Sequence, residues 1–136
     1  MRLLLCKICE FASQQQNGRH SMIGIFDNIV APFFPIDHPP VYLCLQFEFD
    51  PAEAGEPMDV FIKLVDDDAK PLLDFTASGE IPHDPNGGPT RLFMQFQIPL
   101  LRFERPGDYR LEVIFNGARI GEERLPVLLA PAIPLD

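Results

Sequence analysis

The sequence predicts an all-β protein, an antiparallel sandwich or barrel of seven to eight strands, on three observations. Apolar and polar residues alternate in several short runs, which is typical of strands with one buried face. The 15 prolines among 136 residues interrupt the chain between these runs and leave no room for a long helix. Turn sequences such as HDPNGGP and RPGD separate the runs at close intervals, as in antiparallel folds.

Four runs alternate clearly enough to assign their two faces. They are residues 41–50, 58–66, 91–98 and 109–115. Because side chains alternate across a strand, every second residue of each run faces the core. We expect the following core side chains: Val41, Leu43, Leu45, Phe47 and Phe49; Met58, Val60, Ile62 and Leu64; Leu92, Met94, Phe96 and Ile98; and Tyr109, Leu111, Val113 and Phe115.

Two Asn-Gly pairs predict hairpins. Asn116 and Gly117 lie between two strand-like runs, and both central residues of a type I′ turn need positive φ, which Asn and Gly tolerate best. Residues 108–116 and 118–128 should therefore pair. Asn17 and Gly18 join the opening run to SMIGIFDNIV through a longer loop. At this length we expect one domain, residues 1–130, followed by a tail, residues 131–136.

Charge and cysteine content predict the compartment and limit the partners. The net charge of −9 and the pI of about 4.6 disfavour nucleic acid and anionic membranes, since both require clustered Lys and Arg. Three cysteines cannot all pair within one chain, so we expect a reducing, cytoplasmic location. Five residues before Cys6 are too few for a lipoprotein signal, and no apolar window is long enough to span a membrane.

The segment RPGDYRLEVIFNGARIGEERLPV resembles the closing F and G strands of an immunoglobulin-like sandwich. Tyr109 stands where such folds carry a tyrosine corner, in which the hydroxyl binds nearby backbone. The chain has no Trp, and Leu111 replaces the second core cysteine of antibody domains. The resemblance is therefore to the wider immunoglobulin-like architecture, and it implies an antiparallel immunoglobulin-like β-sandwich.

A second resemblance covers most of the chain. The early cysteine pair, GIFDNIVAPFFP and LVDDD together resemble a family of short bacterial proteins known only as a domain of unknown function. It implies a bacterial protein with a sandwich fold, and it implies no activity.

Cys6 and Cys9 have the C-x-x-C spacing of a zinc ligand pair, but a structural zinc site needs four ligands. The remaining candidates are scattered along the chain: Cys44, His20, His38 and His83. In a strand, residues i and i+3 point to opposite faces. The flanking sequence also lacks the alternating β and α pattern of redox C-x-x-C motifs. We therefore expect two buried strand residues, with no metal site and no cofactor.

Loops rich in acidic residues and glycine offer further candidates. Asp66, Asp67 and Asp68 invite a calcium site with Asp50 or Asp84 as helpers, but they lack the spacing of a dedicated calcium loop, and turns prefer Asp anyway. HDPNGGP lacks the lysine of a phosphate loop. Ser13, Ser21 and Ser78 lie in no G-x-S-x-G elbow. We expect no enzymatic activity.

Apolar side chains on the predicted outer faces are the strongest functional signal. Five of them would share one outer sheet face in an immunoglobulin-like strand order and are the predicted partner-binding residues: Tyr42, Cys44, Phe61, Val65 and Ile114. Such a patch marks an interface, unless its members are isolated or the loop VAPFFPIDHPP covers them. We expect a non-catalytic interaction module that binds an unknown protein or a second copy as a homodimer. The alternative is a small-ligand or metal binder that uses the loops at residues 66–68 and 83–88.

Overall fold

The structure, a computed structural model, describes residues 1–131. It has eleven strands and one 3₁₀ turn: β1 (Arg2–Gln14), β2 (His20–Phe26), β3 (Ile29–Ala31), β4 (Ile36–His38), β5 (Val41–Phe49), η1 (Pro51–Glu53), β6 (Pro57–Val65), β7 (Pro71–Glu80), β8 (Thr90–Ile98), β9 (Leu101–Phe103), β10 (Gly107–Phe115) and β11 (Ala118–Leu129). The all-β class is confirmed. Within these residues no helix is long and apolar enough to cross a membrane.

The predicted count of seven to eight strands is wrong. The count rises to eleven because β3, β4 and β9 are strands of three residues each, too short to show alternation in a sequence. The predicted tail, residues 131–136, lies outside the described residues except for Pro131.

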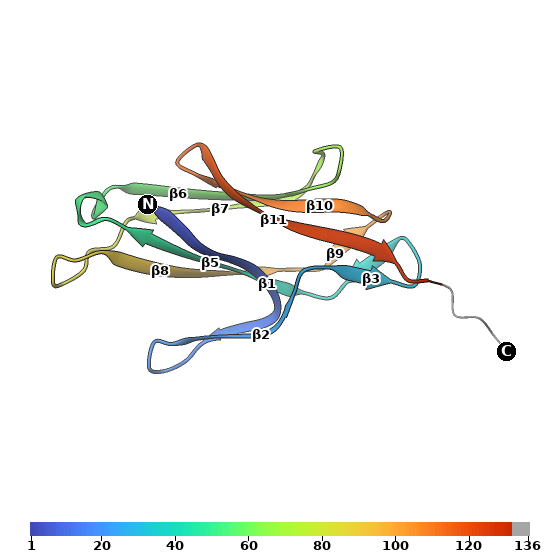
Figure 1. The fold of residues 1–136 in the computed structure, drawn as a ribbon, viewed down its shortest axis with the longest axis horizontal. Coiled ribbons are helices and arrows are strands. Elements are labelled where there is room, and N and C mark those ends of the chain that lie inside the picture. The colour runs from blue at the N-terminus through green and yellow to red at the C-terminus, as the bar shows by residue number, and fades with distance from the viewer. Residues whose placement is uncertain (132–136) are drawn as a thin grey trace.

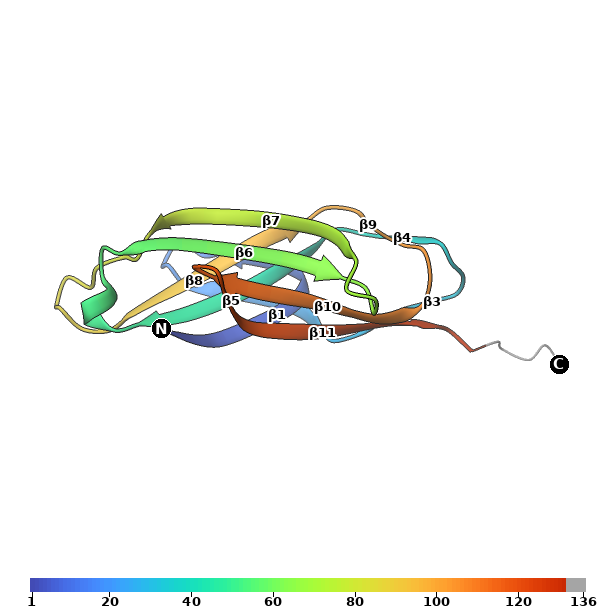
Figure 2. The ribbon, with the colours of Figure 1, turned by 90° about the horizontal axis from the view of Figure 1, so that it is seen from above.

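The strands form two main layers (Figure 1). A four-stranded sheet has the order β2-β1-β5-β8, a five-stranded sheet has the order β3-β11-β10-β6-β7, and β4 pairs with β9 in a separate ribbon. Figure 2, seen from above, shows the long strands of the five-stranded sheet side by side over the other layer. Every pairing is antiparallel except that of β3 with β11, which is parallel.

The core lies between the two sheets, and alternation predicted much of it. Leu43, Leu45 and Phe47 of β5 are fully buried, as are Val60, Ile62 and Leu64 of β6 and Val113 of β10. On β8, Ile98 is buried, whereas Leu92, Met94 and Phe96 are partly buried and pack against the same cluster. The edge position of β8 explains the difference, because only one side of this strand is covered by a neighbour.

The hairpin predicted at Asn116 and Gly117 is confirmed. The two residues have φ of 48° and 83°, the positive values that a type I′ turn requires. β10 and β11 pair from Phe115 with Ala118 back to Gly107 with Val127, with one irregularity after Val113. The turn therefore fixes the register of the central strand β10 against its neighbour β11.

The chain crosses between the sheets after β5. It leaves β5 at Phe49, passes through η1 and enters β6 in the opposite sheet. Proline at position 51 and again at 57 interrupts the extended chain there, since proline cannot donate a ladder hydrogen bond. β5 and β6 are thus consecutive strands that do not pair, and residues on their outer faces point away from each other.

The first half of β1 closes one side of the sandwich against β11. The Lys7 Nζ lies 3.3 Å from a carboxylate oxygen of Glu123. A Cβ on Gly121 would lie 2.7 Å from the Leu3 side chain, so only glycine allows the two strands to approach this closely. Beyond this point β1 curves away and forms a hairpin with β2, visible in Figure 1 on the far side of β5 and β8 from the five-stranded sheet.

Candidate functional site

The five predicted partner-binding residues do not share one face, so that prediction is wrong. Tyr42 and Cys44 belong to β5 in the four-stranded sheet, whereas Phe61 and Val65 of β6 and Ile114 of β10 belong to the five-stranded sheet. The physical reason is the crossing between sheets at η1. The sequence pattern identified the strands and their faces, but it does not say which strands share a sheet.

The three residues on the five-stranded sheet form no continuous apolar patch. Val65 is buried. Phe61 and Ile114 are half-buried neighbours in the register of β6 and β10. One step along the same face, Lys63 pairs with Glu112 at 3.5 Å. A patch of two half-buried side chains beside an ion pair is ordinary protein surface.

The face of β5 that carries Tyr42 and Cys44 is covered by the chain itself. A second apolar cluster forms there, separate from the main core, from buried Cys9, Ala12 and Cys44 and partly buried Leu5, Met22, Tyr42 and Phe93. Its members come from the β1–β2 hairpin on one side and from β5 and β8 on the other. The His20 ring stacks on Phe93 with 3.9 Å between centroids. The hairpin end of the β2-β1-β5-β8 sheet therefore curls over this face of β5 and β8, and Cys44 is fully buried.

The cysteines lie in different surroundings. Cys6 packs against the main core and Cys9 lies in the second cluster, as expected for i and i+3 in a strand. The Cys9 Sγ lies 4.0 Å from the Cys44 Sγ. Burial raises the pKa of the Cys6 thiol to about 12, with a further contribution from Glu123. Burial, and then Cys9, likewise raise the pKa of Cys44 to about 12. At neutral pH these two thiols are protonated, so they are poor nucleophiles, because nucleophilic attack needs the thiolate.

The opposite side of the hairpin exposes an apolar surface. Phe11 of β1 is paired with Ile23 of β2, and Ile25 lies two residues further along β2. Their exposed fractions are 48%, 60% and 58%. The ring of Tyr42 packs edge-on against Phe11, with 5.7 Å between ring centroids. Phe11, Ile23 and Ile25 are called the hairpin surface below.

The hairpin surface includes an unpaired strand edge. Among the described residues, β2 is the outermost strand of its sheet and pairs only with β1. Its sequence, HSMIGIF, has no proline, lysine or carboxylate, which are the residues that usually protect an edge from a second chain. The left-handed Gly24, with φ of 69°, is the one feature of β2 that disturbs a regular edge. The edge is thus open to strand addition on either side of Gly24.

The sequence contained a signal for this surface that pattern reading missed. A turn centred on Asn17 places Phe11 opposite Ile23, since the two residues are equally distant from it. Ile23 and Ile25 then follow the period of two that puts side chains on one face. The sequence pattern does not show that the other face of the β1–β2 hairpin packs over Cys44.

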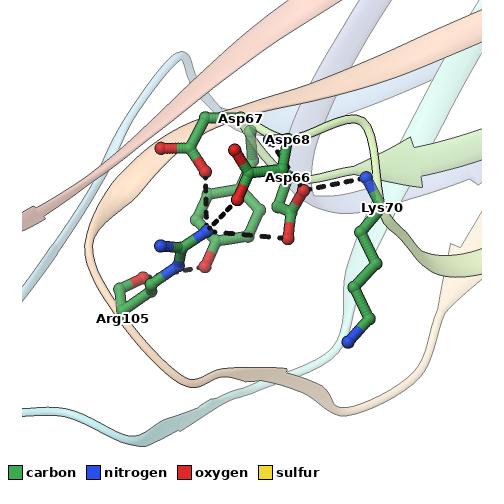
Figure 3. Close-up of polar contacts among 6 residues, drawn as sticks. Asp66, Asp67, Asp68, Lys70 and Arg105 are labelled. Carbon is green, nitrogen blue, oxygen red and sulfur yellow. Dashed lines mark hydrogen bonds and ion pairs between the residues drawn. The ribbon is translucent and has the colours of Figure 1, made fainter.

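The aspartate cluster is held by an internal cation (Figure 3). The Arg105 Nη2 lies 3.0 Å from a carboxylate oxygen of Asp67 and 3.0 Å from one of Asp68, and 3.9 Å from Asp66. The Asp66 Oδ1 accepts hydrogen bonds from the backbone N–H groups of Asp68 and Lys70. The side chain of Arg105 thus supplies the positive charge that a calcium ion would bring.

The other predicted binding loop is also held by its own backbone. The carboxylate of Asp84 accepts hydrogen bonds from the N–H groups of Asn86 at 3.2 Å and Gly88 at 2.9 Å, as in Asx turns. His83 packs beside Gly55. Within residues 1–131, Asp66 to Asp68 is the one group of three acidic, histidine or cysteine side chains close enough to share an ion. Arg105 and backbone N–H groups already bind these carboxylates, and a metal or small-ligand role for either loop stays a prediction.

A comparison with protein families identifies the chain. The model of one family matches residues 4–128. The chain belongs to the family of unknown function DUF6941. This agrees with the resemblance to a family without assigned chemistry. No curated protein matches this DUF6941 chain.

One solved structure that resembles the DUF6941 chain is the Pseudomonas fluorescens alkylpurine DNA glycosylase AlkC, bound to DNA containing an abasic site analogue. The identity is 16% and the TM-score 0.46, and the match covers 74% of this chain and 27% of the glycosylase. The prediction that nucleic acid is no partner is withdrawn, since this glycosylase is bound to DNA. The likeness itself carries no argument about what DUF6941 binds.

Proposed function

We propose that this DUF6941 protein is a non-catalytic protein-interaction module that binds its partner through the hairpin surface. The observation that carries the proposal is the adjacent exposure of Phe11, Ile23 and Ile25 on an edge hairpin. A partner would bury these side chains and add a strand to β2, so that main-chain hydrogen bonds accompany apolar burial.

The size of the surface indicates a modest affinity. Full burial of a large apolar side chain contributes about 1.5–3 kcal/mol, and each of the three is about half exposed. Their remaining surface supplies roughly 3–4 kcal/mol in total. Stable interfaces bury about 800 Å² on each partner, so strand pairing and contacts around the hairpin must contribute the rest. We therefore expect a transient complex.

We propose an immunoglobulin-like topology, supported by the parallel pairing of β3 with β11 and by the tyrosine corner at Tyr109. A bacterial cytoplasm suits the three free cysteines, since reduced thiols are the rule in reducing compartments.

The test compares two matched charge substitutions. Ile23→Asp places a carboxylate in the hairpin surface, and Leu100→Asp places one at an equally exposed apolar residue elsewhere, since both side chains are 60% exposed. Each purified variant is immobilised and incubated with lysate of the source organism, and retained proteins are quantified by mass spectrometry. We expect Ile23→Asp to lose a set of proteins that the wild type and Leu100→Asp both retain. Identical sets on all three proteins would overturn the proposal. Thermal denaturation shows beforehand that each variant is folded.

A further inference from the structure

A cavity of about 520 Å³ lies where β1, β2, β3 and β4 meet the start of β5. Apolar side chains form much of its wall, among them Phe26, Ile36 and Val41, and Glu10 and His38 bring polar groups to it. Its volume falls in the range of small-molecule sites, which are mostly apolar with a few polar groups that orient the ligand. The residues come from segments up to 31 positions apart, from Glu10 to Val41. Only the fold therefore assembles this cavity.

Three residues bring polar side chains to the cavity: Glu10 and His38, and Asn28, whose amide both donates and accepts hydrogen bonds. The His38 Nδ1 lies 2.8 Å from the carbonyl oxygen of Pro39. A carbonyl only accepts, so Nδ1 donates this bond, and in that tautomer Nε2 is an acceptor. The carboxylate of Glu10 forms no ion pair with any residue from 1 to 131. Glu10 thus brings to the cavity a negative charge that no basic side chain among residues 1–131 neutralises.

The position of Glu10 depends on a glycine. A Cβ on Gly24 would lie 2.8 Å from the Cδ of Glu10, a separation at which one of the two groups would have to move. Gly24 also has φ of 69°, a conformation that residues with side chains rarely adopt. The backbone of β2 at Gly24 therefore makes room for the carboxylate at the edge of the cavity.

We propose that this cavity binds an ammonium group carried on an apolar stem. The ammonium would donate hydrogen bonds to the Glu10 carboxylate and the His38 Nε2, and the stem would lie against Phe26 and Ile36. The net charge of −9 favours the approach of a cation over that of an anion. The same chemistry occurs in a free aromatic or aliphatic amine and in a lysine side chain of a protein. The proposal is independent of the hairpin surface.

The first experiment titrates phenethylammonium into the ¹⁵N-labelled protein and follows the amide signals by NMR. We expect saturable shifts at Phe26, Ile36 and His38, and none of comparable size for phenethyl alcohol, which has the same stem without the charge. Glu10→Gln should weaken binding about fivefold, the upper range for an exposed ion pair. Glu80→Gln, a charge-matched change at an exposed glutamate at the end of β7, should leave it unchanged.

A second arm distinguishes the two sources of the cation. N-acetyl-lysine methylamide and a lysine-containing peptide are titrated in the same way. Tighter binding of the peptide identifies a protein side chain as the ligand, and tighter binding of phenethylammonium identifies a small amine. Equal affinity of Glu10→Gln and the wild type for phenethylammonium, shifts that lie elsewhere, or no shifts up to the solubility limit would each overturn the proposal. The labelled spectra also show whether Glu10→Gln is folded, so a misfolded variant is recognised.

Discussion

The hydroxyl of Tyr109 donates a hydrogen bond of 2.8 Å to the backbone oxygen of Arg105. The two residues stand on either side of the turn that leads into β10, and the guanidinium of Arg105 binds Asp67 and Asp68 from the loop after β6. Arg105 thus joins two loops at the same end of the sandwich. Its carbonyl oxygen accepts the hydrogen bond from Tyr109, and its guanidinium binds the aspartates of the other loop. Arg105 is oriented toward the aspartates by a turn that Tyr109 holds.

Tyr109→Phe should destabilise the protein by about 1 kcal/mol. The substitution removes one hydrogen bond and keeps the ring, which packs edge-on against Phe103 at 4.9 Å. Urea denaturation followed by circular dichroism measures the free energy of unfolding. Tyr42→Phe is the matched control, since no hydrogen bond joins the Tyr42 side chain to another described residue. Equal losses in the two variants would show that the Tyr109 hydrogen bond contributes nothing specific.

The free energy of unfolding should decrease as the pH rises above about 9. Cys6 and Cys44 have pKa values of about 12 in the folded protein, against about 8.5 in an unfolded chain. Between these values the unfolded state has lost its thiol protons and the folded state has kept them, so rising pH favours unfolding. Each thiol contributes a slope of up to about 1.4 kcal/mol per pH unit in this window.

Urea denaturation at pH 8, 9, 10 and 11 measures this slope. The double variant Cys6→Ala/Cys44→Ala should have a shallower slope than the wild type, whatever its stability at pH 8. Val65→Ala provides the control, because it also removes buried volume but leaves both thiols in place. It should lower the free energy at every pH and keep the wild-type slope. A double variant as steep as the wild type would assign the pH dependence to other groups.

Two features of the fold were predicted correctly because they depend on residues that are close together in the chain. The turn at Asn116 and Gly117 set the β10–β11 register because two positive φ values were needed at adjacent residues. Alternation identified the buried face of β5, since burial of Leu43, Leu45 and Phe47 follows the period of two. Both inferences use only residues near each other in the chain.

The surface could not be predicted because it depends on long-range packing. The same alternation that places Leu43 in the core puts Cys44 on the other face, where it is predicted to be exposed. Cys44 is buried because residues about 30 positions earlier, Ala12 among them, fold over it. Alternation also does not predict that the chain passes to the opposite sheet at η1, because it shows which face a residue is on and not which strands are neighbours. Met22 packs in the second cluster, whereas Ile23 and Ile25 are exposed.

Phe93→Ala should loosen the β1–β2 hairpin and leave the sandwich intact. Phe93 lies in the second cluster and its ring stacks on that of His20, with 3.9 Å between centroids. Its loss therefore removes apolar contacts that hold the hairpin against β8. Hydrogen exchange measured by mass spectrometry should show faster exchange in residues 12–22, while β10 keeps its protection, because local opening needs less free energy than global unfolding. Phe96→Ala is the control, since Phe96 packs against the main core and Phe75, so its loss should raise exchange in the sandwich strands as well. Unchanged exchange in residues 12–22 of Phe93→Ala would mean that the hairpin is held by β1 alone and that the second cluster does not stabilise it.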